Sequence, residues 1–315
     1  MTFDELEQIR VTLHEKHKKI DRIFFIIATL IVVTLSSFMF FNHRNVSPIV
    51  VLFPAIFFSA VFLLIIYFLV AYFYTKNEAK AYKDAYKTYF VYGSLAKIFT
   101  NIKYEPDAGL SEGFVNDFMF TYDRYFSNDL VSATYKNIKF TQADVHTEQR
   151  HESTDSKGRT TTYYVTIFKG RFLEFDFDRN FSTNIVLHTH LFPGAEHPNP
   201  NGRKFEKLKT ESPDFNKHFT LYAQDGVDAL YVFDPAFMEK VQNLHAACDK
   251  PLLMTFMDKK LCIALDDGKD SFEAPGYRKP LNEDVEFEKV NSDIKVITNF
   301  VDSLNLDRYF KGEKK

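Results

Sequence analysis

The sequence has little cysteine, no tryptophan and none of the short motifs that mark the commonest enzyme classes. Neither phosphate-loop pattern, GxxxxGK(S/T) or GxGxxG, is present, so nucleotide binding by those routes has no support. GxSxG, HExxH and CxxC are also absent, which removes the commonest hydrolase, zincin and thiol-redox classes. Two cysteines, Cys248 and Cys262, do not form a disulfide framework. We interpret them as buried thiols facing a reducing cytosol.

Strong net charge is missing as well. The chain carries 39 basic and 42 acidic side chains, a formal charge of -3. No global field would therefore draw a polyanion to it, and nucleic acid is disfavoured as a partner. Aromatic residues are plentiful instead, with 35 Phe and 17 Tyr. Phenyl rings supply large apolar area with few rotatable bonds, so we expect them to dominate the core.

Charge is absent altogether from two long apolar runs near the N-terminus, Ile23–Phe41 and Ile49–Tyr74. Each is long enough to cross a hydrocarbon core of ~30 Å as a helix. The intervening Asn42–Pro48 permits only a tight turn. A cleaved signal peptide is the first alternative, but the length of the run and the second span that follows at once argue against it. A hydrophobic hairpin buried in a globular core is the other alternative, and two uncharged stretches of this length disfavour it.

Basic residues flank the two spans and predict their orientation. Arg and Lys are retained on the cytoplasmic side of a membrane, so we expect both termini inside and the Asn42–Pro48 turn outside. Four lysines after the second span lie at spacings of three and four, on one face of a helix, where they would meet anionic headgroups. A routine stop-transfer flank with no further role explains them equally well. The predicted membrane-surface residues are Lys76, Lys80, Lys83 and Lys87.

The predicted organisation is a cytoplasmic segment, a membrane hairpin, a juxtamembrane helix and one soluble domain. Their bounds are 1–22, 23–74, 75–103 and 104–315. Helical spacing of Ala and Tyr carries the juxtamembrane helix to about Ile102. Period-two alternation over Ile138–Phe177 predicts an antiparallel meander, with an exposed tip at Asp155–Arg159 and a turn signal at Lys169-Gly170.

The C-terminal half is expected to combine helices with a second hairpin. Asp234-Pro235 is a helix start, and helical periodicity follows it over Ala236–Cys248. Leu252–Met257 and Leu261–Leu265 predict the hairpin. A final amphipathic helix runs from about Asn282 to Leu304, with Val285, Val290, Ile294, Ile297, Phe300, Val301 and Leu304 as its buried stripe. The fold class is therefore α+β: two transmembrane helices, then a soluble domain with an antiparallel sheet and flanking helices.

Three histidines are the most suggestive constellation of possible metal ligands. His188 and His190 would project from one strand face, and His197 could close over them from the Ser182–Arg203 loop. Exposed polar residues at a strand end explain them better, and their spacing matches no known site, so we predict no metal. His146, Glu148 and His151 alternate in the same way, with the same weakness.

Two acidic clusters have similarly ordinary explanations. Glu174, Asp176 and Asp178 alternate with phenylalanine, which is typical of a strand with one solvated face, although paired carboxylates can also perform acid–base catalysis. The run Asp266–Asp270 could hold Ca²⁺ but lacks the remaining ligand spacing of an EF-hand loop. A polar turn accounts for it.

Several stretches between about residues 100 and 306 carry a resemblance to a known family. They are Tyr104–Ser111, Asp129-Leu130, Ala143–Glu148, Thr166–Gly170 with Phe172, Asp225–Tyr231 and Leu304-Asn305-Leu306. In these stretches the soluble part resembles the bacterial membrane-protein family known as domain of unknown function 3137. The resemblance implies one or two N-terminal membrane spans, a bacterial inner-membrane location and no established activity. Some members are encoded beside LemA-type membrane proteins, which implies a shared assembly.

An anchor, a well-patterned core and no catalytic motif lead to one functional hypothesis. We expect a membrane-tethered cytoplasmic interaction domain, whose sheet or Ser182–Arg203 loop docks a protein or a lipid headgroup. The rival hypothesis is a membrane-bound, metal-dependent hydrolase that uses His188, His190 and His197. The first hypothesis names the lipid bilayer and a LemA-type protein as partners and requires no cofactor.

Overall fold

The computed structural model describes residues 1–42, 48–118, 122–176, 182–192 and 203–306, without the side chains of 36, 38–56, 117 and 118. The chain divides into two compact units. The first is Met1–Tyr89 with Ala274–Glu283, and the second is Phe90–Glu273 with Asp284–Lys315. Each unit has its own organisation.

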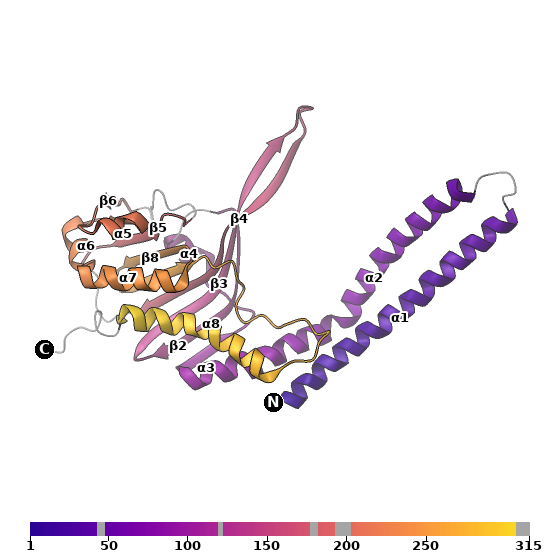
Figure 1. Cartoon of the computed structure of the whole chain (residues 1–315), viewed down its shortest axis with the longest axis horizontal. Coiled ribbons are helices and arrows are strands. Elements are labelled where there is room, and N and C mark those ends of the chain that lie inside the picture. The colour runs from indigo at the N-terminus through magenta and orange to yellow at the C-terminus, as the bar shows by residue number, and fades with distance from the viewer. Residues whose placement is uncertain (43–47, 119–121, 177–181, 193–202, 307–315) are drawn as a thin grey trace. The chain divides into compact units, whose positions relative to one another are not determined.

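The first unit is built on two long helices, α1 (Phe3–Asn42) and α2 (Pro48–Tyr86). They run side by side in opposite directions (Figure 1). The Tyr67 hydroxyl of α2 donates to Asp21 Oδ1 of α1 at 2.6 Å, and the Tyr67 ring packs edge-on against Phe24. Lys16 of α1 forms an ion pair with Glu78 of α2. Polar contacts thus join the helices at the end where the apolar runs give way to charged sequence.

One helical stretch, Phe57–Ile98, is long and apolar enough to cross a membrane, judged by length and composition over the described residues. Its most apolar window is almost entirely exposed, with 6% buried. A core helix of a soluble protein would be covered, so this stretch is suited to a lipid environment. It overlaps the second predicted span. The first predicted span lies within α1, and its crossing of a membrane stays a prediction.

A segment from far along the chain completes the first unit. Residues 274–283 lie against both long helices. Tyr82 donates its hydroxyl to the Pro275 carbonyl oxygen at 3.1 Å, and Arg10 donates to the Tyr277 carbonyl oxygen at 2.6 Å. The Tyr277 ring also stacks on His17. This return of the chain was not visible in the sequence pattern.

The helix after the membrane stretch ends earlier than the predicted Ile102. A π-helix, η1 (Lys87–Tyr92), follows α2, then α3 (Gly93–Ile98). Strand β1 begins at Thr100. Because Phe99 is extended and buried, the last residues assigned to the juxtamembrane helix belong to the sheet of the second unit.

The second unit is built on a nine-stranded sheet in the order β1-β2-β3-β4-β9-β8-β5-β7-β6, with every neighbouring pair antiparallel. The antiparallel prediction is confirmed. The strands are β1 (Thr100–Glu105), β2 (Arg124–Tyr135), β3 (Ile138–Thr154), β4 (Thr160–Asp176), β5 (Ile185–Thr189), β6 (Glu206–Leu208), β7 (Phe219–Ala223), β8 (Leu252–Met257) and β9 (Lys260–Leu265).

The predicted meander is the long hairpin β3–β4, whose distal half projects from the sheet (Figure 1). Its tip lies at Asp155–Arg159, as predicted. The turn expected at Lys169-Gly170 is wrong, because both residues lie inside β4. A Cβ on Gly170 would lie 2.0 Å from the Leu265 carbonyl oxygen. The glycine therefore marks a close approach of two backbones, which is the other common reason for glycine in a strand.

Helices and loops cover both faces of the central strands. On one face, Phe237 of α7 (Pro235–Cys248) packs edge-on against Phe256 of β8, and α8 (Glu283–Leu304) contributes its apolar stripe. On the other face, α4 (Glu112–Phe118) adds Val115 to a cluster with Phe168 and Phe172. Both C-terminal helices and the β8–β9 hairpin were predicted. The remaining helices are α5 (Pro213–His218) and α6 (Gly226–Val232).

Two predictions about individual side chains need correction. Val285 was placed in the buried stripe of α8, but it is 55% exposed, and the first buried residue of that helix is Val290. Of the two cysteines, both of which are free, Cys262 is buried in the sheet while Cys248 is only half-buried at the end of α7.

Candidate functional site

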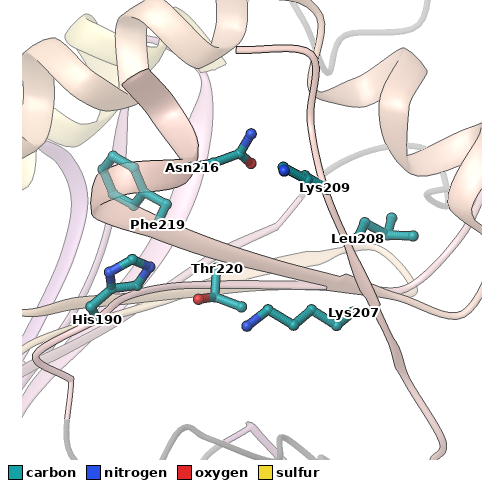
Figure 2. Close-up of a pocket in the computed structure, with 7 residues that line it drawn as sticks. All are labelled: His190, Lys207, Leu208, Lys209, Asn216, Phe219 and Thr220. Carbon is teal, nitrogen blue, oxygen red and sulfur yellow. The ribbon is translucent and has the colours of Figure 1, made fainter. Parts of the chain in front are cut away.

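A pocket of about 480 Å³ opens at the edge of the sheet formed by β6 and β7. Most of its lining is polar or basic, and Figure 2 shows these side chains arranged around one hollow. His190 comes from the residue after β5, and two lysines come from β6 and its end. The lining residues are His190, Lys207, Leu208, Lys209, Asn216, Phe219 and Thr220.

Local structure positions these side chains. The short strand β6 pairs with β7, which sets Lys207 opposite Tyr222. Lys207 and Lys209 are two residues apart, so an extended chain directs them to the same side. Thr210, the residue after Lys209, is held by the Asn216 side-chain amide. Asn216 Nδ2 donates to the Thr210 carbonyl oxygen at 2.8 Å, and Asn216 Oδ1 accepts from Thr210 N at 3.1 Å. The lysine-bearing segment is thereby attached to α5.

The charge around the pocket is basic, although the chain as a whole is slightly acidic. Residues 203–218 contain five Lys or Arg side chains against three Asp or Glu. One of these acids, Asp214, is engaged by Lys217 at 2.9 Å. Burial lowers the pKa of the neighbouring His188, and the charges of His190 and Lys207 lower it further. A pocket with two ammonium groups, an imidazole and a hydroxyl is suited to an anion rich in acceptor oxygens.

The three histidines proposed as metal ligands have different surroundings. His188 is buried in β5, where its Nδ1 lies 2.9 Å from the Thr189 carbonyl oxygen and its ring stacks on Tyr222. His190 follows the strand and is exposed in the pocket. His197 lies outside the described residues. Metal binding by the three histidines therefore stays an untested alternative. Of the two that the structure describes, His190 lines the pocket and His188 does not.

The predicted membrane-surface lysines do not all share one exposed face. Lys76, Lys80 and Lys83 are exposed. Lys76 lies 5.9 Å above the ring of Tyr72, and Lys80 lies 3.7 Å from Asp84. Lys87 is buried at 6% exposure. The change to π-helix at Lys87 alters the rotation per residue, which spacing rules for an α-helix do not anticipate.

The acidic strand face was interpreted as solvated, and this is wrong for Glu174. Its side chain is buried, Lys260 of β9 donates to it at 2.8 Å, and burial raises its pKa despite that partner. Asp176 is exposed as expected, and Asp178 lies outside the described residues. In the same β3–β4 hairpin, His146 Nε2 lies 3.8 Å from Glu148 and 2.9 Å from the Thr166 hydroxyl.

A second concentration of charge surrounds the buried Arg171 of β4. Its guanidinium donates to the Asp293 carboxylate of α8 at 2.8 Å and lies 3.5 Å from Asp267. Asp144 is directly opposite in the β3–β4 register. Burial raises the pKa of Asp144 to about 8, the charges of Asp129 and Asp270 add to this, and Arg171 opposes it. Sequence patterns did not reveal this cluster, because its members come from four separate segments.

One known protein family matches the C-terminal part of the chain. Residues 166–306 match a family described as a protein of unknown function, DUF3137. The predicted resemblance is confirmed over those residues, which include the Thr166–Gly170, Asp225–Tyr231 and Leu304–Leu306 stretches. The three earlier stretches lie outside the match. No curated protein matches the chain.

One solved structure is similar to part of the chain, the mycobacterial trehalose monomycolate transport factor A, TtfA. Sequence identity is 10% and the TM-score is 0.36. The similarity covers 71% of this chain and 94% of the other.

Proposed function

We propose that this protein is a membrane-anchored interaction module whose pocket at the β6–β7 edge binds a phosphate-bearing anion, with a lipid headgroup as the leading candidate. The observation that carries the proposal is the convergence of Lys207, Lys209 and His190 on one hollow. A phosphate offers several strong acceptors to such donors. A headgroup is favoured because a chain tethered to a bilayer meets headgroups at a high effective concentration.

Because the charged side chains of the pocket are exposed, we expect them to bind an anion with modest affinity. Lys207, Lys209 and His190 are exposed, so they lose little hydration before the ligand arrives. Each basic residue near an anionic surface contributes about 1 kcal/mol. Two lysines therefore contribute about 2 kcal/mol, or roughly a 30-fold change in Kd. A reversible, salt-sensitive interaction is the expected behaviour.

Removal of both lysines tests the proposal. The purified full chain in detergent is titrated with inorganic phosphate and with a short-chain phosphatidylglycerol, and binding is followed by thermophoresis. The double variant Lys207→Gln/Lys209→Gln should weaken phosphatidylglycerol binding by at least about tenfold. Lys204→Gln removes the same kind of charge from an exposed residue outside the pocket and should change Kd less than about twofold.

The two ligands distinguish the sources of the anion. Binding of phosphatidylglycerol that greatly exceeds that of phosphate, and that depends on Lys207 and Lys209, supports the headgroup. Equal affinity for both ligands supports a free phosphate compound instead. Unchanged binding in the double variant would overturn the assignment of the pocket.

A metal-dependent hydrolase is the alternative function. Its observation is that His188 and His190 lie within three residues at the end of β5. Against it, His188 is buried and its Nδ1 contacts a main-chain oxygen. Elemental analysis of the purified chain discriminates: stoichiometric zinc, lost in His188→Gln and His190→Gln, would favour the enzyme.

The orientation in the membrane belongs to the same proposal. We infer that both termini and the second unit face the cytoplasm of a bacterial cell, from the basic flanks of the two apolar runs. Reporter tags at residues 1 and 315 should give a cytoplasmic signal, and a tag in Asn42–Pro48 the opposite one. A LemA-type membrane protein remains the expected partner by family resemblance, to be sought by crosslinking in the membrane.

A further inference from the structure

Three carboxylates that the sequence patterns did not connect lie close together in the second unit. Asp129, Asp270 and Glu273 each offer one oxygen, and these oxygens lie within 4.8 Å of one another. Asp129 is fully buried, Glu273 is half-buried and Asp270 is exposed. The group therefore extends from the protein interior to solvent.

The backbone holds Asp129 in an unusual conformation at this place. The β2–β3 register shifts between Asn128 and Val131, and Asp129 has a φ of 56°. The Tyr104 hydroxyl donates to its carboxylate. The Asn128 amide nitrogen lies between the two arms of the group, 2.9 Å from Asp129 Oδ2 and 3.2 Å from Asp270 Oδ1. A rotation of this amide would present an oxygen to the same space.

Asp144 supplies an independent sign that a ligand belongs here. It is 3% exposed, and its Oδ2 accepts from Ser271 N at 2.5 Å. Its Oδ1 is buried and has no hydrogen-bond partner in the described part of the chain. Asp144 pairs with Asn128 across the strands, and Ser271 follows Asp270. Asp129 and Asp270 both act electrostatically on Asp144, so its unpartnered oxygen adds negative charge beside the group.

Arg171 is the obvious internal cation for Asp144, since the two residues are opposite in register, but it is directed elsewhere. It is hydrogen-bonded to Asp293 and lies near Asp267. An unpartnered carboxylate oxygen in a protein interior costs free energy unless a proton or a cation satisfies it. A cation reached from the exposed Asp270 side would satisfy it.

We propose that Asp129, Asp270 and Glu273 form a binding site for calcium, with the free oxygen of Asp144 as a further buried negative group beside it. All three ligands are carboxylate oxygens, which a hard divalent cation prefers. Calcium–oxygen distances are about 2.4 Å, so two ligands of one ion are at most about 4.8 Å apart, in agreement with the spacing of the group. Magnesium requires shorter distances and near-ideal octahedral geometry, for which residues from two separate segments are less suited.

The site also revises the interpretation of the Asp266–Asp270 run. Asp267 Oδ1 accepts from Lys269 N at 3.0 Å, which is a polar-turn contact, whereas Asp266 Oδ1 accepts from Lys169 N of β4 at 3.2 Å. The Asp270 carboxylate accepts from the Asn128 amide of β2. The ligands come from distant segments instead of one loop, which is why EF-hand spacing is absent.

Calorimetry of the full chain in detergent, stripped with EDTA, tests the site with CaCl₂ and MgCl₂. We expect one calcium ion per chain, bound more tightly than magnesium, and a higher Tm in calcium. Asp270→Asn should weaken binding by at least about tenfold, and it is exposed, so folding should survive. Asp129→Asn should also weaken calcium binding by at least about tenfold. Its backbone conformation should be kept, because asparagine tolerates positive φ. Glu211→Gln, an exposed acid outside the group, should leave Kd unchanged within about twofold.

Three results would overturn the proposal. No heat and no Tm shift up to about 5 mM calcium would show that the protein's own cations already balance these carboxylates. Tighter binding of magnesium would overturn the calcium assignment. Binding that survives both Asp270→Asn and Asp129→Asn would place the ion elsewhere.

Discussion

The basic pocket and the carboxylate group belong to the same folded unit but are built in opposite ways. The pocket takes most of its lining from one stretch of chain, 207–220, and its lysines are exposed. The carboxylate group takes its members from β2 and the segment after β9, and it extends from the fully buried Asp129 to the exposed Asp270. Exposed charges keep their hydration and need no partner, whereas buried charges must be compensated. A charged side chain at the exposed pocket therefore has little effect on the stability of the fold, whereas a buried charged side chain has a large one.

Among the substitutions that test this comparison, Arg171→Met should cause the largest loss in the free energy of unfolding. The side chain is 1% exposed, and its removal leaves Asp267 and Asp293 without their buried cation, at a cost of about 3–5 kcal/mol. Urea unfolding of the full chain, followed by near-UV circular dichroism, measures the loss. The control is Lys260→Met on the neighbouring strand, where the lysine is 39% exposed and less than half of that cost is expected. Equal losses would show that burial is not what separates the two pairs.

Gly170→Ala should have the next largest effect, because it acts on the backbone beside the acidic segment. The new Cβ would lie 2.0 Å from the Leu265 carbonyl oxygen, so β4 and the segment after β9 must separate. We expect a loss of about 1–3 kcal/mol in the same unfolding experiment. Gly113→Ala, where a Cβ meets nothing within 4 Å, should be neutral or slightly stabilising. A neutral Gly170→Ala would contradict the close approach.

Salt should sharpen the comparison between the two sites. Raising NaCl from about 0.05 M to about 0.5 M shortens the Debye length severalfold, which screens exposed charges more than buried ones. Phosphatidylglycerol binding at the pocket should weaken by about fivefold. Calcium binding at the half-buried carboxylates should change by no more than about twofold. Parallel salt dependences in the two titrations would remove the distinction.

The smallest effect concerns pH and His188. Burial lowers its pKa in the folded chain below the ordinary value of 6.5, so protonation favours the unfolded state. Its contribution to stability is complete above pH 6.5 and is lost as pH falls from there toward the folded pKa. Between pH 7.5 and pH 5.5 the Tm of the wild type should fall about 2 °C further than that of His188→Gln. Identical slopes would show that His188 titrates as it does in the unfolded chain.

Much of the fold could be predicted from local pattern. The alternation along β3 and β4 predicted their hairpin and its tip, and the Asp234-Pro235 start predicted α7, whose N-cap carboxylate does accept from Phe237 N. The membrane stretch within Phe57–Ile98 followed from its length and lack of charge. These features depend on residues near one another in the chain, where periodicity and capping act directly.

Other features depended on tertiary structure, because their partners are distant in sequence. Glu174 resembled a solvated residue until Lys260 and burial were known. Gly170 was interpreted as a turn residue, but in the structure it lies within a strand beside the Leu265 carbonyl oxygen. Of the candidate site residues that the structure describes, only His190 lies in the pocket, and the sequence analysis did not single out Lys207 or Lys209.

By itself, the sequence determined the apolar membrane stretch, the α+β class and the antiparallel hairpins, since each follows from hydrophobic patterning along a continuous segment. Only the tertiary structure decided which charges meet. It placed Lys207 and Lys209 around a hollow, and it brought Asp129 of β2 together with Asp270 and Glu273 from the segment after β9. The physical reason is that a side chain's charge acts on whatever folding places within a few ångströms of it, and that neighbourhood is not written in local sequence order.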